Sequence, residues 1–116
     1  MKPTDQIEYE GCSGKTYFCN FVPGFYGNGN LALELVGATG TPYEGEPIVR
    51  VTVNPGYPIP DGRIAIKDYS ENEGMVDFCK KAGIIGREIS VIHMNFVTIP
   101  VYELTESGKE IFSSLK

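Results

Sequence analysis

The chain has few of the residues from which catalytic and metal sites are built. His93 is the only histidine, and the three cysteines (Cys12, Cys19 and Cys79) include no CxxC pair. A Cys–His or Ser–His dyad would have to use His93, and no nucleophile signature surrounds any cysteine. Three cysteines and one histidine could supply four zinc ligands, but the close pair typical of zinc sites is missing. We therefore expect no metal, no cofactor and no catalytic residue that the sequence can identify.

Other absences limit the partners. No apolar run approaches the ~20 residues of a membrane span, so we expect no membrane association. Lys and Arg number 10 against 15 Asp and Glu, and the formal net charge is −5. This charge repels nucleic acid, so we expect no direct nucleic-acid contact. The odd cysteine count and the polar N-terminus favour free thiols in a reducing cytoplasm.

Turn-forming residues are abundant, with Gly 14 and Pro 8 among 116 residues. They favour short strands over long helices, and Asn28-Gly29 predicts a hairpin turn whose two central residues both have positive φ. The three prolines within residues 54–62 predict an extended surface loop, and Pro100 predicts an edge strand or a bulge. Alternating patterns predict strands over residues 15–22, 31–36, 49–53, 64–66, 89–94 and 96–104.

One interior helix is predicted over residues 70–82. Ser70 and Glu73 have the spacing of a capping box, and Gly83 is the expected left-handed residue after the last turn. The apolar stripe of this helix consists of Met75, Phe78, Cys79 and Ala82.

These elements predict a single α+β domain over residues 1–116. Its twisted, mainly antiparallel sheet would have about five to six strands, with the interior helix packed on one face. Ser107 and Glu110 form a second possible capping box, which predicts a short C-terminal helix over residues 105–116. Residues 1–14 are polar and form either an ordered edge or a frayed lead-in.

The candidate binding residues are tyrosines in predicted loops and carboxylates near the helix entry. Loop aromatics are typical of protein-recognition surfaces, although they also cap the ends of sheets. The carboxylates could contact a basic partner, although the polar face of a helix also accounts for them. The candidates are Tyr26, Tyr43, Tyr57, Asp61, Asp68, Glu71, Glu73 and Asp77.

About two-thirds of the chain resembles a family of small uncharacterised bacterial proteins carried on conjugative transposons, plasmids and phages. The matching segments are Tyr-Gly-Asn-Gly-Asn-Leu-Ala-Leu-Glu-Leu (26–35), Gly-Glu-Pro-Ile-Val-Arg-Val-Thr-Val-Asn (45–54), Ala-Ile-Lys-Asp-Tyr-Ser-Glu-Asn-Glu-Gly-Met (65–75) and Ile-Pro-Val-Tyr-Glu-Leu (99–104). The resemblance implies a small cytosolic accessory protein of mobile DNA. It implies no activity and no site residues.

We therefore expect a non-catalytic binding protein of a mobile genetic element, with inhibition of a host defence nuclease by an acidic surface as the specific case. The expected partner is a protein, and the sequence does not define the oligomeric state. Two alternatives stay open. One is a small cytosolic enzyme that uses His93 with a thiol or a carboxylate, and the other is an assembly protein of the transfer machinery.

Overall fold

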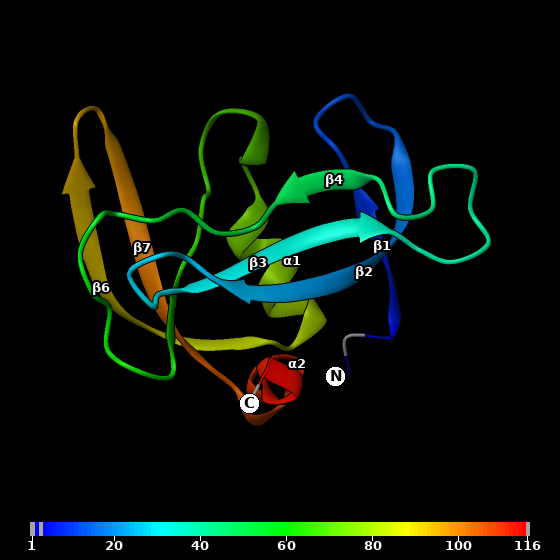
Figure 1. Ribbon diagram of the computed structural model, residues 1–116. Helices are drawn as coiled ribbons and strands as arrows, with labels where there is room; N and C mark the ends of the chain where they lie inside the picture. The colour runs from blue at the N-terminus through cyan, green and yellow to red at the C-terminus, as the bar shows by residue number, and fades with distance from the viewer. Residues whose placement is uncertain (1, 3, 116) are drawn as a thin grey trace.

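The computed structural model of the protein contains seven strands and two α-helices in the part of the chain that it describes, residues 2 and 4–115. Of Ser114 only the backbone is described, and residues 1, 3 and 116 of the predicted lead-in and C-terminal helix lie outside the described part. Figure 1 shows the arrangement. The elements are β1 (Gln6–Glu10), β2 (Thr16–Phe25), β3 (Leu31–Gly37), β4 (Pro47–Arg50), β5 (Arg63–Ala65), α1 (Met75–Ala82), β6 (Ile85–Met94), β7 (Val97–Leu104) and α2 (Glu106–Phe112), with 3-10 turns at Ser70–Asn72 and Ser113–Leu115.

Four strands form an antiparallel sheet in the order β1-β2-β3-β4. Alternation of side chains along β2 and β3 turns one face of the sheet inward, so that Cys19, Phe21, Leu33 and Leu35 are buried. Helix α1 covers this inner face, behind the sheet in Figure 1. The lead-in, predicted as either an edge or frayed, supplies the edge strand β1.

The remaining strands form a second antiparallel sheet in the order β5-β7-β6. Strand β7 is central, so the prediction of an edge strand at Pro100 is wrong; the pairing irregularities lie along β6, at Ile85/Glu88 and Glu88/Ser90. As the middle strand, β7 uses the carbonyl of Pro100, which accepts from Ile66 N at 3.0 Å.

Residues 51–53 join the two sheets. Val51 N donates to Leu33 O at 2.9 Å, and Lys67 N donates to Val51 O at 2.9 Å. Thr52 forms an isolated bridge with Ile66. This connection brings side chains that follow β4 next to side chains that follow β5.

Helix α1 begins five residues later than predicted, at Met75. Ser70 has φ 54° and starts the 3-10 turn, so the Ser70–Glu73 capping box does not form. Asp68 takes its place, because its Oδ1 accepts from the N–H groups of Gly74 at 2.6 Å and Met75 at 3.0 Å. Gly83 ends the helix in the left-handed region, as predicted, with φ 77°.

The apolar stripe of α1 packs on the four-stranded sheet. Met75 and Cys79 are fully buried. The Phe78 ring packs edge-on against Tyr9 of β1, with centroids 5.1 Å apart, and lies 6.3 Å from the ring of Phe21. The predicted stripe is therefore confirmed, although its helix is shorter.

Helix α2 lies below the sheets in Figure 1. An N-terminal cap and the close packing of Gly108 against the backbone of Ile84 hold it in place. Its N-cap is Thr105, whose Oγ1 accepts from Gly108 N at 3.0 Å, so the predicted Ser107–Glu110 box is wrong. Thr105 also donates to Gly83 O at 2.6 Å. A Cβ on Gly108 would lie 2.2 Å from Ile84 O, so only glycine allows this close approach.

The hairpin between β2 and β3 forms as predicted, with a different turn. Tyr26 N donates to Asn30 O, and Gly29 N donates to Tyr26 O. Gly29 alone has positive φ there, 89°, whereas Asn28 does not. The turn is therefore a three-residue type with glycine in the left-handed position.

The Pro-rich loop that follows the 51–53 segment is attached to this hairpin by a buried asparagine. Asn30 Nδ2 donates to Asn54 Oδ1 at 3.1 Å and to Tyr57 O at 2.9 Å, and Asn30 Oδ1 accepts from Ile59 N at 2.8 Å. The loop forms no strand, as expected. The Asn30 side chain therefore holds the loop by hydrogen bonds, in place of backbone pairing between strands.

The α+β class, the antiparallel pairing, the interior helix on one sheet face and the short C-terminal helix are confirmed. The strands are divided between sheets of four and three within the described residues.

Candidate functional site

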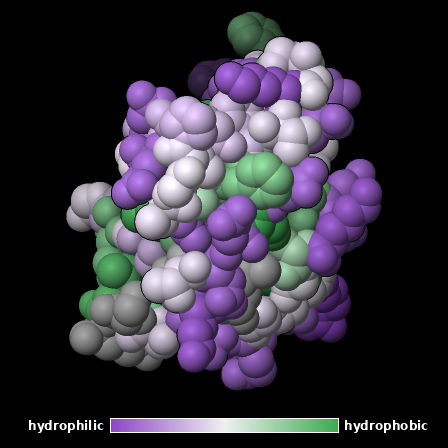
Figure 2. Space-filling model, turned by 90° about the vertical axis from the view of Figure 1, so that its right-hand side faces the viewer, coloured by the Kyte–Doolittle hydropathy of each residue, from purple (hydrophilic) through white to green (hydrophobic). Residues whose placement is uncertain are grey.

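The predicted tyrosines lie at separate places. Tyr43 belongs to the loop between β3 and β4, and its hydroxyl accepts from Phe18 N at 2.8 Å. Its ring packs edge-on against Tyr17, with centroids 5.3 Å apart. Tyr43 thus caps the sheet, the alternative role considered for it. Figure 2 views the molecule from the side of this loop and shows mostly polar residues around a smaller apolar area.

Of the other two tyrosines, Tyr26 lines a hollow described below and Tyr57 is an exposed loop residue. Tyr57 is 50% exposed in the loop held by Asn30. Tyr26 is half-buried, and its hydroxyl shares a 3.0 Å hydrogen bond with Thr52 Oγ1. This bond sets the orientation of the Tyr26 ring.

The carboxylates near the helix entry have different surroundings. Asp68 caps α1 and is occupied by two backbone N–H groups. Glu71 forms an i,i+4 ion pair with Lys67, and this hydrogen bond lowers the pKa of Glu71. Glu73 and Asp77 are exposed. The structure therefore does not gather these four carboxylates into one free acidic surface.

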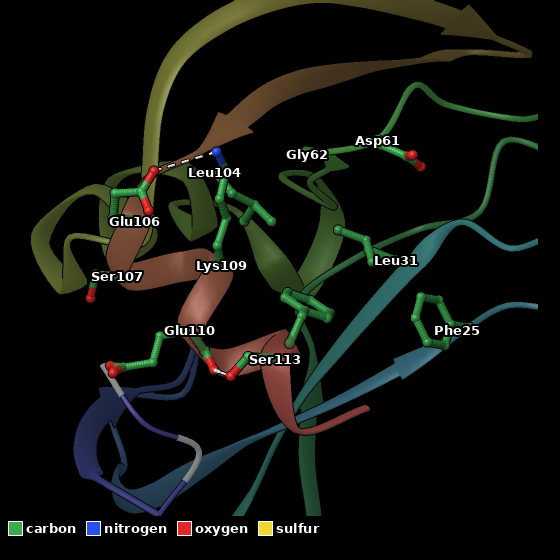
Figure 3. A pocket seen from close by; sticks show the side chains of 11 residues that line it. Phe25, Leu31, Asp61, Gly62, Leu104, Glu106, Ser107, Lys109, Glu110 and Ser113 are labelled. Atoms are coloured by element: carbon green, nitrogen blue, oxygen red, sulfur yellow. Dashed lines mark hydrogen bonds and ion pairs between the residues drawn. The ribbon is translucent and has the colours of Figure 1, made fainter. Parts of the chain in front are cut away.

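The fifth predicted carboxylate, Asp61, borders a groove of about 1080 Å³. The groove runs between α2, the β2–β3 hairpin and the turn at Asp61–Gly62. Figure 3 shows Phe25 and Leu31 on one side of this space and Lys109 of α2 on the other, with the Glu110 side chain directed away from Phe25 and Leu31. The apolar lining residues are Phe25, Leu31, Leu104 and Phe112.

The border of the groove is more acidic than basic. Asp61, Glu106 and Glu110 face one cation, Lys109, which lies 3.5 Å from Glu106. Asp61 is exposed, and no ion pair involves it in the part of the chain that the structure describes. Phe25 is 56% exposed, although the other apolar residues that line the groove are partly or fully buried. An exposed aromatic ring beside carboxylates suits a ligand with both apolar and cationic groups.

A second, smaller hollow of about 310 Å³ lies where the two sheets join. Arg50 lies over the ring of Tyr26, with 5.9 Å from Cζ to the centroid, and Lys67 lies over the ring of Tyr69 at 5.6 Å. Thr52, which is buried, Val53 and Asn54 complete the lining. Two cations and two aromatic rings therefore surround one small cavity.

His93 and the thiols do not form the arrangement that nucleophilic catalysis requires. His93 is exposed on β6, and its partner is Thr98 Oγ1 at 3.5 Å. Burial raises the pKa of Cys19 to about 11 and that of Cys79 to about 12, so both thiols are protonated at neutral pH. Within residues 2 and 4–115, no thiol or carboxylate is hydrogen-bonded to His93.

No cluster of three or more His, Cys, Asp or Glu side chains in the described residues could hold a metal ion. Neither described helix is long and apolar enough to cross a bilayer. Comparison of the chain with protein-family models, with curated proteins and with solved structures found no match.

Sequence reasoning missed most of the residues that line the two hollows. Phe25 and Leu31 come from the β2–β3 hairpin, and Phe112 comes from α2. No local pattern brings these segments together. A signal was available for the smaller hollow, because Arg50, Thr52 and Asn54 alternate on one face, opposite three valines. The contribution of Lys67 and Tyr69 depends on the pairing between the two sheets.

Proposed function

We propose that the protein is a non-catalytic binding protein whose groove beside α2 receives a basic segment of a partner protein. The observation that supports this proposal is the combination of an exposed aromatic ring with a predominantly acidic border in one groove of about 1080 Å³. The partner segment would insert an apolar side chain against Phe25 and Leu31. Its Lys or Arg residues would lie near Asp61.

Charge favours a basic partner over an acidic one. The protein carries a formal net charge of −5, which attracts a positively charged surface at long range. The carboxylates at the groove border would add short-range specificity, and their effect would weaken as salt rises. The nucleic-acid groove of a nuclease has the required positive charge. The specific case that we propose is therefore an acidic inhibitor of a host defence nuclease.

The family resemblance supports a proposed cellular context for this function. A small accessory protein of a conjugative transposon, plasmid or phage would meet such a nuclease in the host cytoplasm. Three free thiols fit that reducing compartment.

The test uses matched pairs of variants. Phe25→Ala and Asp61→Asn change the groove, whereas Phe96→Ala and Asp77→Asn change an exposed ring and an exposed carboxylate elsewhere. A partner captured from host lysate at low salt is purified, and its affinity for each variant is measured by calorimetry. Loss of a central aromatic contact should weaken binding by about 30-fold, and the Asp61 variant should show a smaller salt dependence.

The proposal fails if no basic protein is captured. It also fails if the purified partner binds Phe25→Ala as tightly as it binds Phe96→Ala. If a basic partner does bind through the groove, a nuclease assay of that partner distinguishes inhibition of a nuclease from binding without inhibition.

A further inference from the structure

The smaller hollow at the junction of the sheets carries features that the groove lacks. Its cations, Arg50 and Lys67, each lie over a tyrosine ring, and the cavity between them is about 310 Å³. This volume is at the low end of the range for small-molecule sites, so the cavity can hold only one small molecule.

Both cations can still donate hydrogen bonds to an added anion. Arg50 lies 3.6 Å from Glu34, which is longer than a normal hydrogen bond, and its side chain is 54% exposed. A guanidinium has five N–H donors, so the pair with Glu34 and the hydrogen bond to Tyr26 still leave donors available. Lys67 is paired with Glu71, whose side chain is 57% exposed, so the carboxylate can move into solvent when a stronger anion binds.

The tyrosines and the floor are fixed in place before any ligand arrives. Thr52 Oγ1 accepts from Leu33 N at 3.1 Å and is hydrogen-bonded to the Tyr26 hydroxyl. Tyr69 packs against the smaller apolar cluster formed by Ala65 and its neighbours. A preorganised aromatic wall lowers the cost of stacking a planar ring against it.

Asn54 adds a directional donor. Its Oδ1 accepts hydrogen bonds from Asn28, Asn30 and Gly56, each at 3.1 Å. Because three donors point at the same atom, that atom is the amide oxygen of Asn54. The Nδ2 group of Asn54 is therefore the one that can donate to a ligand. The ligand should therefore combine an anion, a planar ring and a hydrogen-bond acceptor on that ring.

We propose that this hollow binds a single nucleotide, with the phosphate between Arg50 and Lys67, the base beside Tyr69, and a base acceptor near Asn54 Nδ2. A phosphate accepts charge-assisted hydrogen bonds from both cations. The net charge of −5 disfavours a polyanionic strand, whereas a mononucleotide carries too little charge to be excluded. This inference is independent of the protein-binding groove.

The test measures binding of AMP, GMP, CMP and UMP by calorimetry and by chemical-shift changes in the ¹⁵N spectrum. Adenosine and inorganic phosphate serve as partial ligands, and oligothymidine represents a strand. Arg50→Gln is compared with Arg87→Gln, which alters a similar ion pair with Glu103, and Lys67→Gln is compared with Lys80→Gln, which removes a similar contact between a lysine and the Tyr102 ring. Neither control residue lines the hollow. Loss of one charged contact should raise Kd about tenfold, and the control variants should leave it unchanged.

Nucleotide-dependent shifts should centre on the amides of residues 50–54 and 67–69. The proposal is overturned if none of the four nucleotides binds, or if the shifts lie elsewhere. It is equally overturned if adenosine binds as tightly as AMP, if Arg50→Gln behaves like Arg87→Gln, or if the oligonucleotide binds more tightly than the mononucleotides.

Discussion

Replacement of Asn30 by alanine should release the Pro-rich loop from the hairpin and destabilise the protein. The Asn30 side chain is 4% exposed and makes three hydrogen bonds, to Asn54, Tyr57 and Ile59. At about 1 kcal/mol for each bond, the loss approaches ~3 kcal/mol. Part of it is recovered because Tyr57 lies near solvent and its carbonyl can bind water. We therefore expect a decrease of about 2–3 kcal/mol in the free energy of unfolding.

The measurement is urea denaturation followed by far-UV circular dichroism, with thermal unfolding as a second readout. A loss of this size should lower Tm by roughly 8–15 °C for a chain of this length. Asn28→Ala is the matched control. Asn28 is exposed, and it forms one hydrogen bond to the same Asn54 Oδ1 and accepts a weaker one from Asn30 N at 3.3 Å. Its replacement should cost less than about 1 kcal/mol.

The reasoning would be refuted if the two alanine variants had equal stability. It would also be refuted if Asn30→Ala cost less than about 1 kcal/mol, because three buried hydrogen bonds would then contribute almost nothing. A change in the denaturant slope would indicate that the loop is detached in the native state of the variant.

Three further changes test the packing, capping and protonation described above. Gly108→Ala should destabilise by about 2 kcal/mol or more, because its Cβ would meet Ile84 O at 2.2 Å, whereas Gly27→Ala, with no atom within 4 Å, should be nearly neutral in the same denaturation assay. Thr105→Ala should cost about 1 kcal/mol through loss of the α2 cap, and Thr105→Ser should restore most of it. The folded-state pKa of Cys79, about 12, lies above its unfolded value, so this thiol stabilises the fold below about pH 8.5 and that contribution decreases as pH rises toward 12. Denaturation at pH 7 and pH 10 should show the loss, and a thiol reagent at pH 7 should label the exposed Cys12 long before the buried Cys79.

The sequence predicts those parts of the fold that depend on neighbouring residues. The predicted strand over residues 49–53 is confirmed only in part, because β4 covers Pro47–Arg50 and residues 51–53 join the two sheets. The stripe from Met75 to Ala82 identifies the face of α1 that is buried. The cap of α1 was misassigned because Ser70 and Glu73 satisfy the local spacing rule. Asp68 lies before the 3-10 turn, outside that spacing, and its Oδ1 accepts instead from the N–H groups of Gly74 and Met75.

The candidate sites were harder to predict because they depend on pairing between distant segments. Asp61 was identified as an acidic contact, but its place beside Phe25 and α2 follows from how α2 packs under the hairpin. The junction hollow likewise depends on the bridge between Thr52 and Ile66, which sets Lys67 beside Arg50. Local patterns carry no information about how distant strands pair. Carboxylates that are close in sequence near the helix entry therefore have separate surroundings in the fold.

The β6–β7 hairpin ends in a turn at Asn95 and Phe96, and the apolar side chains nearest the tip, Ile92, Met94 and Val97, pack against a small cluster separate from the main core. Phe96 is fully exposed at this tip and lines neither hollow. The tip therefore offers an attachment point for a fluorophore or a surface tether. Immobilising the protein there would leave the groove and the junction hollow open to incoming molecules, so that binding at each could be followed on a single oriented preparation.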